Sequence, residues 1–322
     1  MKKNALVLGG YGFIGSNLVE KLLNLDMNVT VIDNLDPYSG GNLYNLEKYI
    51  NNIEFIKGSI SDYDLVCKSV TNKDYIFNCA ASTSHTLSMK KPWLNLKINC
   101  EGVINILEAI RRYNIDSKFI HISTTTQLGK LIYTPADEKH PEFPRDIYSA
   151  NKMVSEKYVL LYQRTYNVNS IVIRLPNVFG PKAAIHSPDL TFNNYFIGLA
   201  LQNKPITVFK PGTQLRNTIY VDDAIRALTM SAFSNINSGI YQAVHDEHVS
   251  VIDIAKKTVE VIGGSLNLIN WPTDRKMFEI GDAILDNQEI KKILGWKPKV
   301  SLKDGLEKTN NYFVKIIDRY LK

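Results

Sequence analysis

The chain has 322 residues, of which 44 % are hydrophobic and 22 % are charged. This length and composition suit a globular protein with a large core and argue against disorder. Lys and Arg exceed Asp and Glu by six (38 minus 32), a mild surplus that would help attract an anionic ligand. No basic run resembles a nucleic-acid-binding arm, and no apolar run approaches the ~20 residues of a membrane span. We therefore expect a cytoplasmic protein with neither nucleic acid nor membrane as a partner.

The amino-terminal residues have the pattern of a strand, a glycine-rich turn and an amphipathic helix. The strand is Ala5-Leu6-Val7-Leu8, and the helix runs from Ser16 to about Leu25. Between them lie three glycines at three-residue spacing, with two apolar residues before the last: Gly9, Gly12, Phe13, Ile14 and Gly15. Glycine lets a backbone touch a pyrophosphate, whose charge the helix N-terminus stabilises. The pattern predicts dinucleotide binding, with an ordinary glycine-rich turn as the alternative.

A second strand, Asn28 to Ile32, ends at Asp33 and is followed by Asn34. A carboxylate at this point can accept both hydroxyls of an adenosine ribose, but it would repel the 2′-phosphate of NADP. The position of Asp33 therefore favours NAD as the cofactor, unless the acidic residue is incidental.

Strands and helices continue to alternate through the first half of the chain. We expect strands at Ile53–Lys57, Tyr75–Asn78, Lys118–Ser123 and Ser170–Leu175, and helices near Tyr63–Val70, Leu94–Tyr113 and Tyr148–Tyr166. This alternation predicts an α/β fold with a doubly wound parallel sheet. Such sheets bind ligands beyond the carboxyl ends of their strands. The motifs expected at that edge are Gly9–Gly15, Ala80-Ala81, Ser123-Thr124 and Pro176-Asn177.

After Pro181 the alternation loosens, and prolines punctuate shorter elements. We expect a smaller α/β lobe that closes over the cofactor and binds the substrate. Residues 1–175 and 218–245 are assigned to the dinucleotide-binding domain, and residues 176–217 and 246–322 to the substrate-binding lobe.

Tyr148 and Lys152 lie four residues apart in a segment compatible with a helix, so both side chains project from one face. A phenol loses its proton near pH ~10, and use as a base at neutral pH requires about 4 kcal/mol of preferential stabilisation of the phenolate. A nearby ammonium supplies much of that stabilisation. The alternative is a chance pair on a solvated helix face.

Two features invite a metal site without supporting one. The run His245-Asp246-Glu247-His248 directly follows the predicted strand Gly239–Ala243, where a polar turn is expected. The three cysteines lack metal-ligand spacing and suit a reducing compartment. We expect no metal.

Taken together, the ordered motifs resemble the extended short-chain dehydrogenases/reductases, specifically the NAD-dependent nucleotide-sugar epimerases and dehydratases. The resemblance spans nearly the whole chain. It rests on the glycine turn, Asp33, Gly58-Ser59-Ile60-Ser61-Asp62, Ala80-Ala81, Asn99 with Gly102, Ser123-Thr124, Tyr148 with Lys152, Arg174 to Pro181, Arg216 to Asp223, and Leu294-Gly295-Trp296-Lys297-Pro298. It implies a Rossmann-type sheet, NAD as cofactor, and a homodimer formed through the helices Leu94–Tyr113 and Tyr148–Tyr166.

The resemblance also implies roles for individual residues around the cofactor. Tyr148 would remove the proton from a sugar hydroxyl, Lys152 would bind the nicotinamide ribose and keep Tyr148 ionised, and Thr124 would orient the same hydroxyl. Ala80 and Ala81 would line the cofactor. Asp62 would contact adenine and Asn99 would steady the active-site backbone, although each could instead be a helix cap or a polar core group.

For the substrate, the resemblance implies that Asn177 and Arg216 hold the phosphates and that Phe209 lies against the nucleotide base. Ser84 and His85 follow Ala80-Ala81 into the expected pocket, where His85 contacts the sugar or satisfies a loop carbonyl. Glu279 stands where the family often has a second phosphate arginine. Arg275 or Lys276 would then have to reach the phosphates from one turn away.

The family opens several reactions by oxidation at the fourth carbon of the sugar. Related 4,6-dehydratases place Asp-Glu after the catalytic threonine, whereas Thr125-Thr126 stand there in this chain. The glutamate and arginine of a decarboxylase cannot be located. Because the residues of a dehydratase and of a decarboxylase are not found, the leading hypothesis is a 4-epimerase, most simply of a UDP-sugar. A dehydratase, decarboxylase, 4-ketoreductase or non-catalytic NAD-binding regulator are the alternatives.

Overall fold

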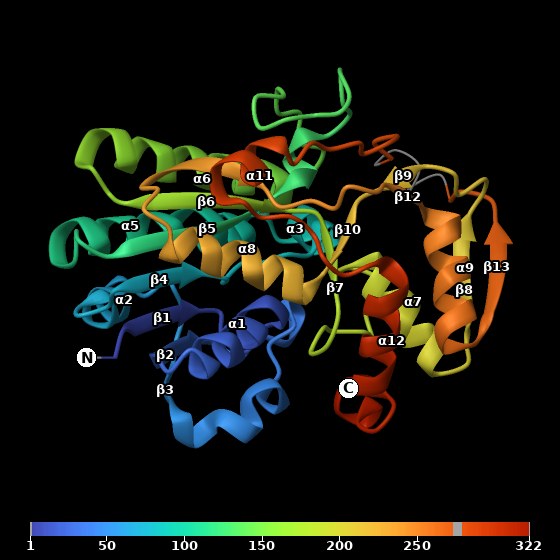
Figure 1. Ribbon diagram of the computed structural model, residues 1–322, viewed down its shortest axis with the longest axis horizontal. Coiled ribbons are helices and arrows are strands. Elements are labelled where there is room, and N and C mark those ends of the chain that lie inside the picture. Colours follow the sequence, from blue (N-terminus) through green and yellow to red (C-terminus); the bar gives the residue numbers. More distant parts are fainter. Residues whose placement is uncertain (1, 273–278, 322) are drawn as a thin grey trace.

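A seven-stranded parallel sheet forms the centre of the molecule (Figure 1). The structure is a computed structural model that describes residues 2–272 and 279–321. The strand order is β11-β6-β5-β4-β1-β2-β3, and every pairing is parallel. The strands are β1 (Asn4–Leu8), β2 (Asn28–Asp33), β3 (Ile53–Lys57), β4 (Tyr75–Asn78), β5 (Lys118–Thr124), β6 (Ser170–Leu175) and β11 (Ser238–Gln242). The predicted doubly wound sheet is confirmed.

Helices cover both faces of this sheet, which is why its strands are apolar throughout. Alternate residues of β1 face opposite cores: Ala5 and Val7 join the core with α1, while Leu6 and Leu8 join the core with α5. One layer contains α1 (Phe13–Asn24) and α8 (Val221–Phe233), beside the 3-10 segment η2 (Leu43–Asn52). The other contains α2 (Tyr63–Val70), α5 (Gly102–Tyr113) and α6 (Ile147–Tyr166).

The helix expected at Leu94–Tyr113 is interrupted. It is divided into α4 (Pro92–Leu96), the π-helical turn η3 (Lys97–Glu101) and α5. The side chains of Asn95 and Asn99 both donate to the Ser82 carbonyl, at 3.0 and 2.9 Å, in the loop after β4. A π-turn is a local insertion that apolar periodicity does not reveal, and such turns are frequent beside functional sites.

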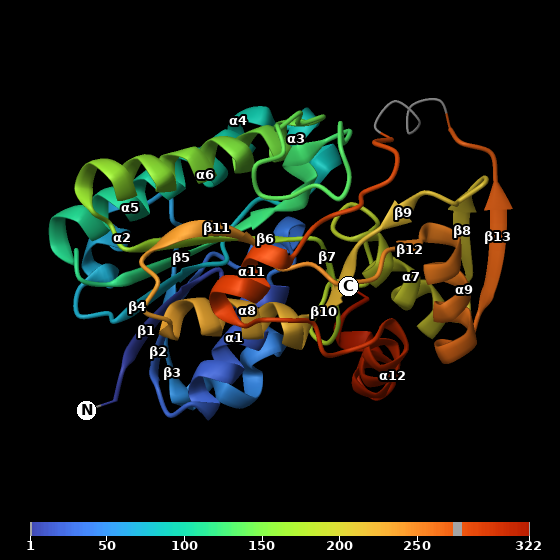
Figure 2. The ribbon, with the colours of Figure 1, turned by 45° about the horizontal axis from the view of Figure 1, so that its top comes forward.

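A smaller lobe lies at one end of the sheet (Figure 2). Its own two-stranded sheet pairs β8 (Pro205–Phe209) with β13 (Ser265–Ile269), and its core contains Phe196, Ile206 and Ile254. The helices of the lobe are α7 (Phe192–Leu201), α9 (Val251–Ile262) and α12 (Leu302–Phe313). Two short pairs, β7 (Asn177–Phe179) with β10 (Thr218–Tyr220) and β9 (Leu215–Arg216) with β12 (Val249–Ser250), connect the lobes.

The carboxyl-terminal segment does not stay within the smaller lobe. From α11 (Gln288–Leu294), Ile290 enters the core beside α8, and so does Trp296, whose indole N–H donates to the Asp223 carbonyl at 3.0 Å. The domain boundaries expected from the sequence stay a prediction.

The remaining described elements are short: α3 (His85–Lys90) and the 3-10 turns η1 (Pro37–Ser39), η4 (Thr125–Leu128) and η5 (Ile317–Arg319). Across the described ranges, we find no helix with the length and apolarity that crossing a bilayer would require.

Candidate functional site

A crevice opens at the carboxyl ends of β1, β4, β5 and β6, at the point where the strand order reverses direction beside β1. Two adjoining pockets share Gly9, Gly12, Cys79, Ala80 and Ala81. One pocket continues toward the end of β2, where Asp33, Asn34, Ser59 and Ile60 line it. The other continues over β5 and β6 and includes Phe13, Ile14, Gly15, His85, Thr124, Tyr148, Lys152 and Asn177. Most of the predicted site residues therefore meet in one place.

The glycine turn packs against itself on one side and is open on the other. A Cβ at Gly15 would lie 2.1 Å from the Gly9 carbonyl oxygen, so backbone contact excludes any side chain there. A Cβ at Gly12 would meet only the same oxygen, at 3.4 Å. Gly12 is also the N-cap of α1 and lines both pockets, next to the free backbone N–H groups of the first helical turn. This cradle suits a pyrophosphate.

Asp33 closes the opposite end of the cradle. Its carboxylate accepts hydrogen bonds from the backbone N–H groups of Tyr11 at 2.8 Å and Leu35 at 2.7 Å. Burial raises the pKa of Asp33, an effect that these backbone bonds oppose. Each carboxylate oxygen has a second lone pair, which leaves capacity for the hydroxyls of a ribose. Together with Gly12, this geometry fits a bound NAD.

Tyr148 and Lys152 lie on the first turns of α6 and face the crevice with Thr124, the last residue of β5. Burial, and then the charge of Asp146, raises the pKa of Tyr148 above its usual range, while a hydrogen bond with Thr124 lowers it. Burial lowers the pKa of Lys152 to about 8. The Lys152 ammonium donates to the Ile122 carbonyl at 2.5 Å. In the chain alone, the expected lowering of the tyrosine pKa by this lysine is therefore not seen.

A hydrogen-bonded chain of side chains surrounds Tyr148. His85 Nδ1 lies 2.7 Å from Asp146 Oδ2, and the rings of His85 and Tyr148 meet edge to face with centroids 4.9 Å apart. The Ser149 hydroxyl lies 3.2 Å from Asp146 Oδ2 and 3.1 Å from Thr126 Oγ1, which in turn is 3.1 Å from Thr124 Oγ1.

Three members of this site were not predicted from the sequence: Asp146, Thr126 and Ser149. Asp146 had a detectable signal, because an aspartate immediately before a helical pattern is a typical N-cap, and its side chain does accept from the Ser149 N–H. No signal in the sequence indicated the contact of Asp146 with His85, which lies 61 residues away in the chain.

The crevice lining does not include the predicted residues Asn99, Asp62 and Ser84. Asn99 is buried and bonds both backbone groups of Ser82, accepting from its N–H at 3.0 Å and donating to its carbonyl at 2.9 Å. Asp62 is exposed and caps α2, while Ser84 is buried and caps α3. The cap alternative therefore describes the side-chain contacts of Asp62, and the Ser84 hydroxyl accepts from the Leu87 N–H at 3.0 Å.

The predicted phosphate and base contacts are only partly assembled. Asn177 lines the crevice and donates to the Asn217 carbonyl at 3.1 Å. Arg216 lies outside the crevice lining, where it pairs with Glu279 at 2.7 Å and donates to the Gly281 carbonyl at 2.6 Å. Phe209 stacks against Trp271, with centroids 4.7 Å apart. Arg275 and Lys276 lie outside the described residues.

The His245–His248 turn is occupied by internal contacts. His248 Nε2 accepts from the Leu285 N–H at 2.8 Å, and Asp246 pairs with Lys291 at 2.5 Å. Among residues 2–272 and 279–321, no group of three or more His, Cys, Asp or Glu side chains could hold a metal ion.

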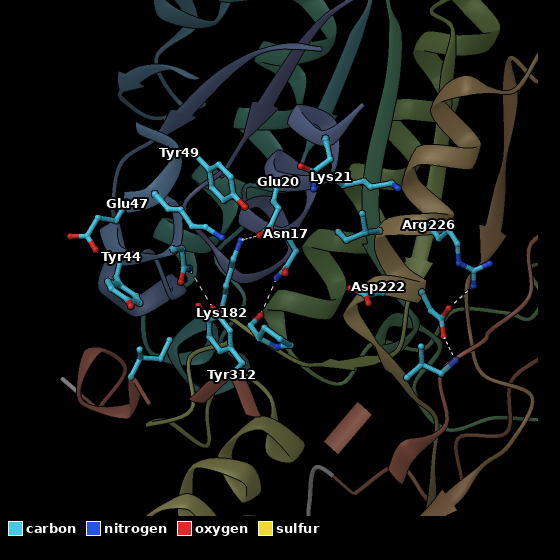
Figure 3. Close-up of a pocket in the computed structure, with 18 of the residues that line it drawn as sticks. Asn17, Glu20, Lys21, Tyr44, Glu47, Tyr49, Lys182, Asp222, Arg226 and Tyr312 are labelled. Atoms are coloured by element: carbon cyan, nitrogen blue, oxygen red, sulfur yellow. Dashed lines mark hydrogen bonds and ion pairs between the residues drawn. The ribbon is translucent and has the colours of Figure 1, made fainter. Parts of the chain in front are cut away.

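A second pocket lies beneath α1, between η2, the start of α8 and the end of α12 (Figure 3). In Figure 3 the Lys182 ammonium points to Glu20, and the two are 2.5 Å apart. Asn17 donates to the Pro181 carbonyl at 3.0 Å, and Arg226 pairs with Asp223. Two pairs of charged groups in this α1 pocket are thus bonded to each other.

Comparison with known proteins supports the geometry. Residues 5–242 match the model of the NAD dependent epimerase/dehydratase family. The low-salt glycan biosynthesis protein Agl12 of Haloferax volcanii is 32 % identical, over 97 % of this chain and 98 % of its own. UDP-glucuronic acid decarboxylase 1 of Xenopus tropicalis is 30 % identical, over 98 % of this chain and 73 % of its own.

Solved structures agree. UDP-glucose 4-epimerase from Thermotoga maritima, determined with UDP-glucose, superimposes with a TM-score of 0.88 at 30 % identity and covers 98 % of this chain and 99 % of its own. Other solved neighbours were determined with NAD. The relatives catalyse different reactions of nucleotide sugars on one scaffold. The chain therefore belongs to the NAD-dependent epimerase/dehydratase family of nucleotide-sugar enzymes and takes NAD as its cofactor.

Proposed function

We propose that the protein is a nucleotide-sugar 4-epimerase, with a UDP-sugar as the leading substrate. The observation that carries this proposal is the convergence of Thr124, Tyr148 and Lys152 on one crevice with the glycine cradle. UDP-glucose 4-epimerase from Thermotoga maritima, which was determined with UDP-glucose, supports the choice of nucleotide and of reaction.

In this proposal, Tyr148 takes the proton of the sugar's 4-hydroxyl and later returns it, while Thr124 hydrogen-bonds the same oxygen. The residues that hold NAD are the Gly9–Gly15 turn, Asp33, Asn34, Ala80, Ala81 and Lys152. Bound NAD supplies the acceptor for the hydride of the same carbon and the donor that gives it back. Rotation of the keto sugar between these events inverts the carbon.

The raised pKa of Tyr148 sets a requirement for this mechanism. Positive charge must be present beside the phenol before it can act as a base near neutral pH. We propose that Lys152 and the positive charge of oxidised NAD provide it together, and that the low exposure of Tyr148, 9 %, strengthens their effect.

The choice of epimerisation over dehydration rests on the residues after Thr124. Thr125 and Thr126 carry hydroxyls, which do not ionise near neutral pH and cannot replace the acid and base of an Asp-Glu pair. In the structure, Thr126 is bonded to Thr124 and Ser149. Epimerisation needs no group at this position.

We also propose a homodimer formed through α4 and α6. Trp93 is 79 % exposed, Leu96 41 % and Leu161 53 %, and burying such apolar surface against a second copy would favour association. Sedimentation velocity should give twice the 36.5 kDa chain mass. Trp93→Ser combined with Leu161→Ser should give the single mass.

The decisive test of the proposed reaction is a panel of UDP-, CDP-, GDP- and dTDP-sugars incubated with the purified protein. We expect interconversion of 4-epimers for at least one sugar, without net NADH and with NAD that stays bound during purification. Net loss of water or carbon dioxide would instead indicate a dehydratase or a decarboxylase. Stoichiometric NADH release would indicate a simple oxidoreductase, and no turnover of any sugar would favour a regulator.

A further inference from the structure

The pair formed by His85 and Asp146 is not used by the proposed epimerisation, although it lies inside the same crevice. His85 is the first residue of α3 and lines the pocket that contains Tyr148. Asp146 is the N-cap of α6, two residues before Tyr148. The edge-to-face contact of the His85 and Tyr148 rings, at 4.9 Å between centroids, places the imidazole beside the group that would face the sugar.

The hydrogen bonds of this pair define the state of the imidazole. Burial raises the pKa of Asp146, but bonds and charge from His85, with bonds from Ser149, outweigh it and leave that pKa below its usual range. Asp146 is therefore an acceptor, and His85 Nδ1 carries the hydrogen of their 2.7 Å bond. The imidazolium carries a second hydrogen on Nε2, whereas the neutral ring leaves Nε2 with its lone pair, so the ring can give or take a proton at this nitrogen. Within residues 2–272 and 279–321, no group hydrogen-bonds Nε2.

The position of the pair is fixed from both sides. The Ser88 hydroxyl donates to the His85 carbonyl at 2.7 Å and accepts from the Tyr148 N–H at 3.1 Å, which ties the start of α3 to the start of α6. The carboxylate holds the imidazole in one orientation, the arrangement by which an acid–base histidine is commonly prepared. At the same time, the His85 side chain is 44 % exposed, so its protons can exchange with water.

We infer that His85, oriented by Asp146, is a second acid–base group of the crevice and exchanges the hydrogen on a carbon next to the sugar ketone. This inference rests on the proposed function, because that function creates a ketone at the fourth carbon. Nε2 takes the proton, the electron pair of the C–H bond becomes the carbon–carbon double bond of an enolate, and the carbonyl oxygen receives the charge. Return of a proton from the imidazolium restores the ketone, and no redox partner is needed.

The consequence is an activity beyond inversion at the fourth carbon. A proton returned to the same face introduces a solvent hydrogen. A proton that water delivers to the other face of the enolate, while the imidazolium releases its own proton to solvent, inverts the third or fifth carbon. The substrate class is therefore a nucleotide 4-keto sugar.

The test supplies the ketone directly. The NAD-loaded protein is mixed with UDP-4-keto-6-deoxyglucose in D₂O, and proton NMR follows the signals at the third and fifth carbons. We expect one signal to disappear faster than in buffer, and His85→Gln to slow that loss about 10²-fold, the usual contribution of a general base. His186→Gln is the matched control, since His186 lies outside the crevice lining, bonded to the Tyr320 carbonyl, and should leave the rate unchanged.

A second variant guards against a folding defect. Asp146→Asn keeps an N-cap for α6, because asparagine caps as well as aspartate, but it removes the carboxylate that orients His85. It should also slow the exchange while retaining bound NAD. Exchange no faster than in buffer, or equal in wild type and His85→Gln, would overturn the inference. Formation of 4-epimers without such exchange would support the proposed function and contradict the role of His85. Exchange without formation of 4-epimers would support the role of His85 and contradict the proposed function.

Discussion

The crevice at the sheet edge is smaller than the α1 pocket, yet it is the crevice that contains the predicted catalytic residues. The α1 pocket measures about 760 Å³, and the crevice portion around Tyr148 about 210 Å³. In the larger space, Lys182 is neutralised by Glu20 and Arg226 by Asp223. In the smaller one, Tyr148 and Lys152 are buried with pKa values displaced toward their neutral forms. Burial lowers the pKa of Lys182 in the α1 pocket as well, so the crevice differs in that Lys152 has no carboxylate within salt-bridge distance among the described residues.

Tyr148→Phe compared with Tyr49→Phe is the strongest way to test this comparison. Loss of the Tyr148 hydroxyl should lower kcat about 10²- to 10⁴-fold, because it removes the base but keeps the packing ring. The Tyr49 hydroxyl hydrogen-bonds Glu20 in the α1 pocket, and its loss should leave kcat unchanged. Steady-state turnover and bound NAD measure both effects. Similar losses in the two variants would contradict the assignment of the crevice.

Lys152→Met should reveal the cost of a buried ammonium. Its pKa in the fold is about 8, whereas an unfolded lysine titrates near ~10.4. Below pH 8 both states carry the proton, so the fold bears the whole cost, about 3 kcal/mol. Between these two values the folded lysine is neutral and the unfolded one charged, and wild-type stability recovers as pH rises.

Urea unfolding of NAD-free protein checks this prediction. The methionine variant should be more stable than wild type by about 3 kcal/mol at pH 7, with a smaller gain near pH 10. It should also lose turnover. A variant less stable than wild type at both pH values would show that the ammonium contributes favourably to the fold.

Glu20→Gln should lower the stability of the fold and leave turnover unchanged. Lys182 has a side chain only 7 % exposed, and removal of its partner leaves a buried charge uncompensated. The free energy of unfolding should fall by about 1–3 kcal/mol with kcat/KM unchanged. Glu47→Gln is the control, because Glu47 is exposed in the same pocket, and should change stability by less than about 0.5 kcal/mol. A comparable fall in kcat/KM would give the α1 pocket a role in turnover.

Glu279→Gln is the mildest probe and concerns Arg216, which lies outside the crevice lining. If Arg216 binds phosphate, Glu279 competes with the substrate for it, since the two side chains are 2.7 Å apart. Removing that charge should lower KM for the nucleotide sugar about two- to fivefold, the usual range for a partly exposed ion pair, without changing kcat. The difference should shrink as salt is added. A raised KM would mean that Glu279 positions Arg216 for binding.

The sequence predicted those parts of the site that depend on strand ends. Gly12, Asp33, Thr124 and Tyr148 follow or flank predicted strands and helices, and parallel strands bring such positions to one edge. Contacts between distant helices were beyond its reach. His85 meets Asp146 only because α3 packs on α6, and the π-turn at Asn99 inserts a residue that leaves the apolar pattern intact.

The contacts made by residues of the smaller lobe were also beyond local sequence patterns, for a related reason. Phe209 and Arg216 belong to short strands whose placement depends on how that lobe meets the sheet. In the structure, the ring of Phe209 packs against Trp271, and Arg216 forms an ion pair with Glu279. The sequence motifs identified residue types that suit a nucleotide. They did not reveal the neighbouring side chains that these residues contact in the structure.

The glycine turn combines two different constraints that a motif search treats as one. A methyl group at Gly15 would strike the backbone of Gly9, so alanine there should disturb the fold whether or not a ligand ever binds. A methyl group at Gly12 meets no comparable obstacle from the protein, so alanine there would be felt only by the occupant of the cradle. In descendants that had abandoned nucleotides, Gly15 would persist while Gly12 became free to drift. Gly12 is thus the better indicator of a working cofactor site in related chains.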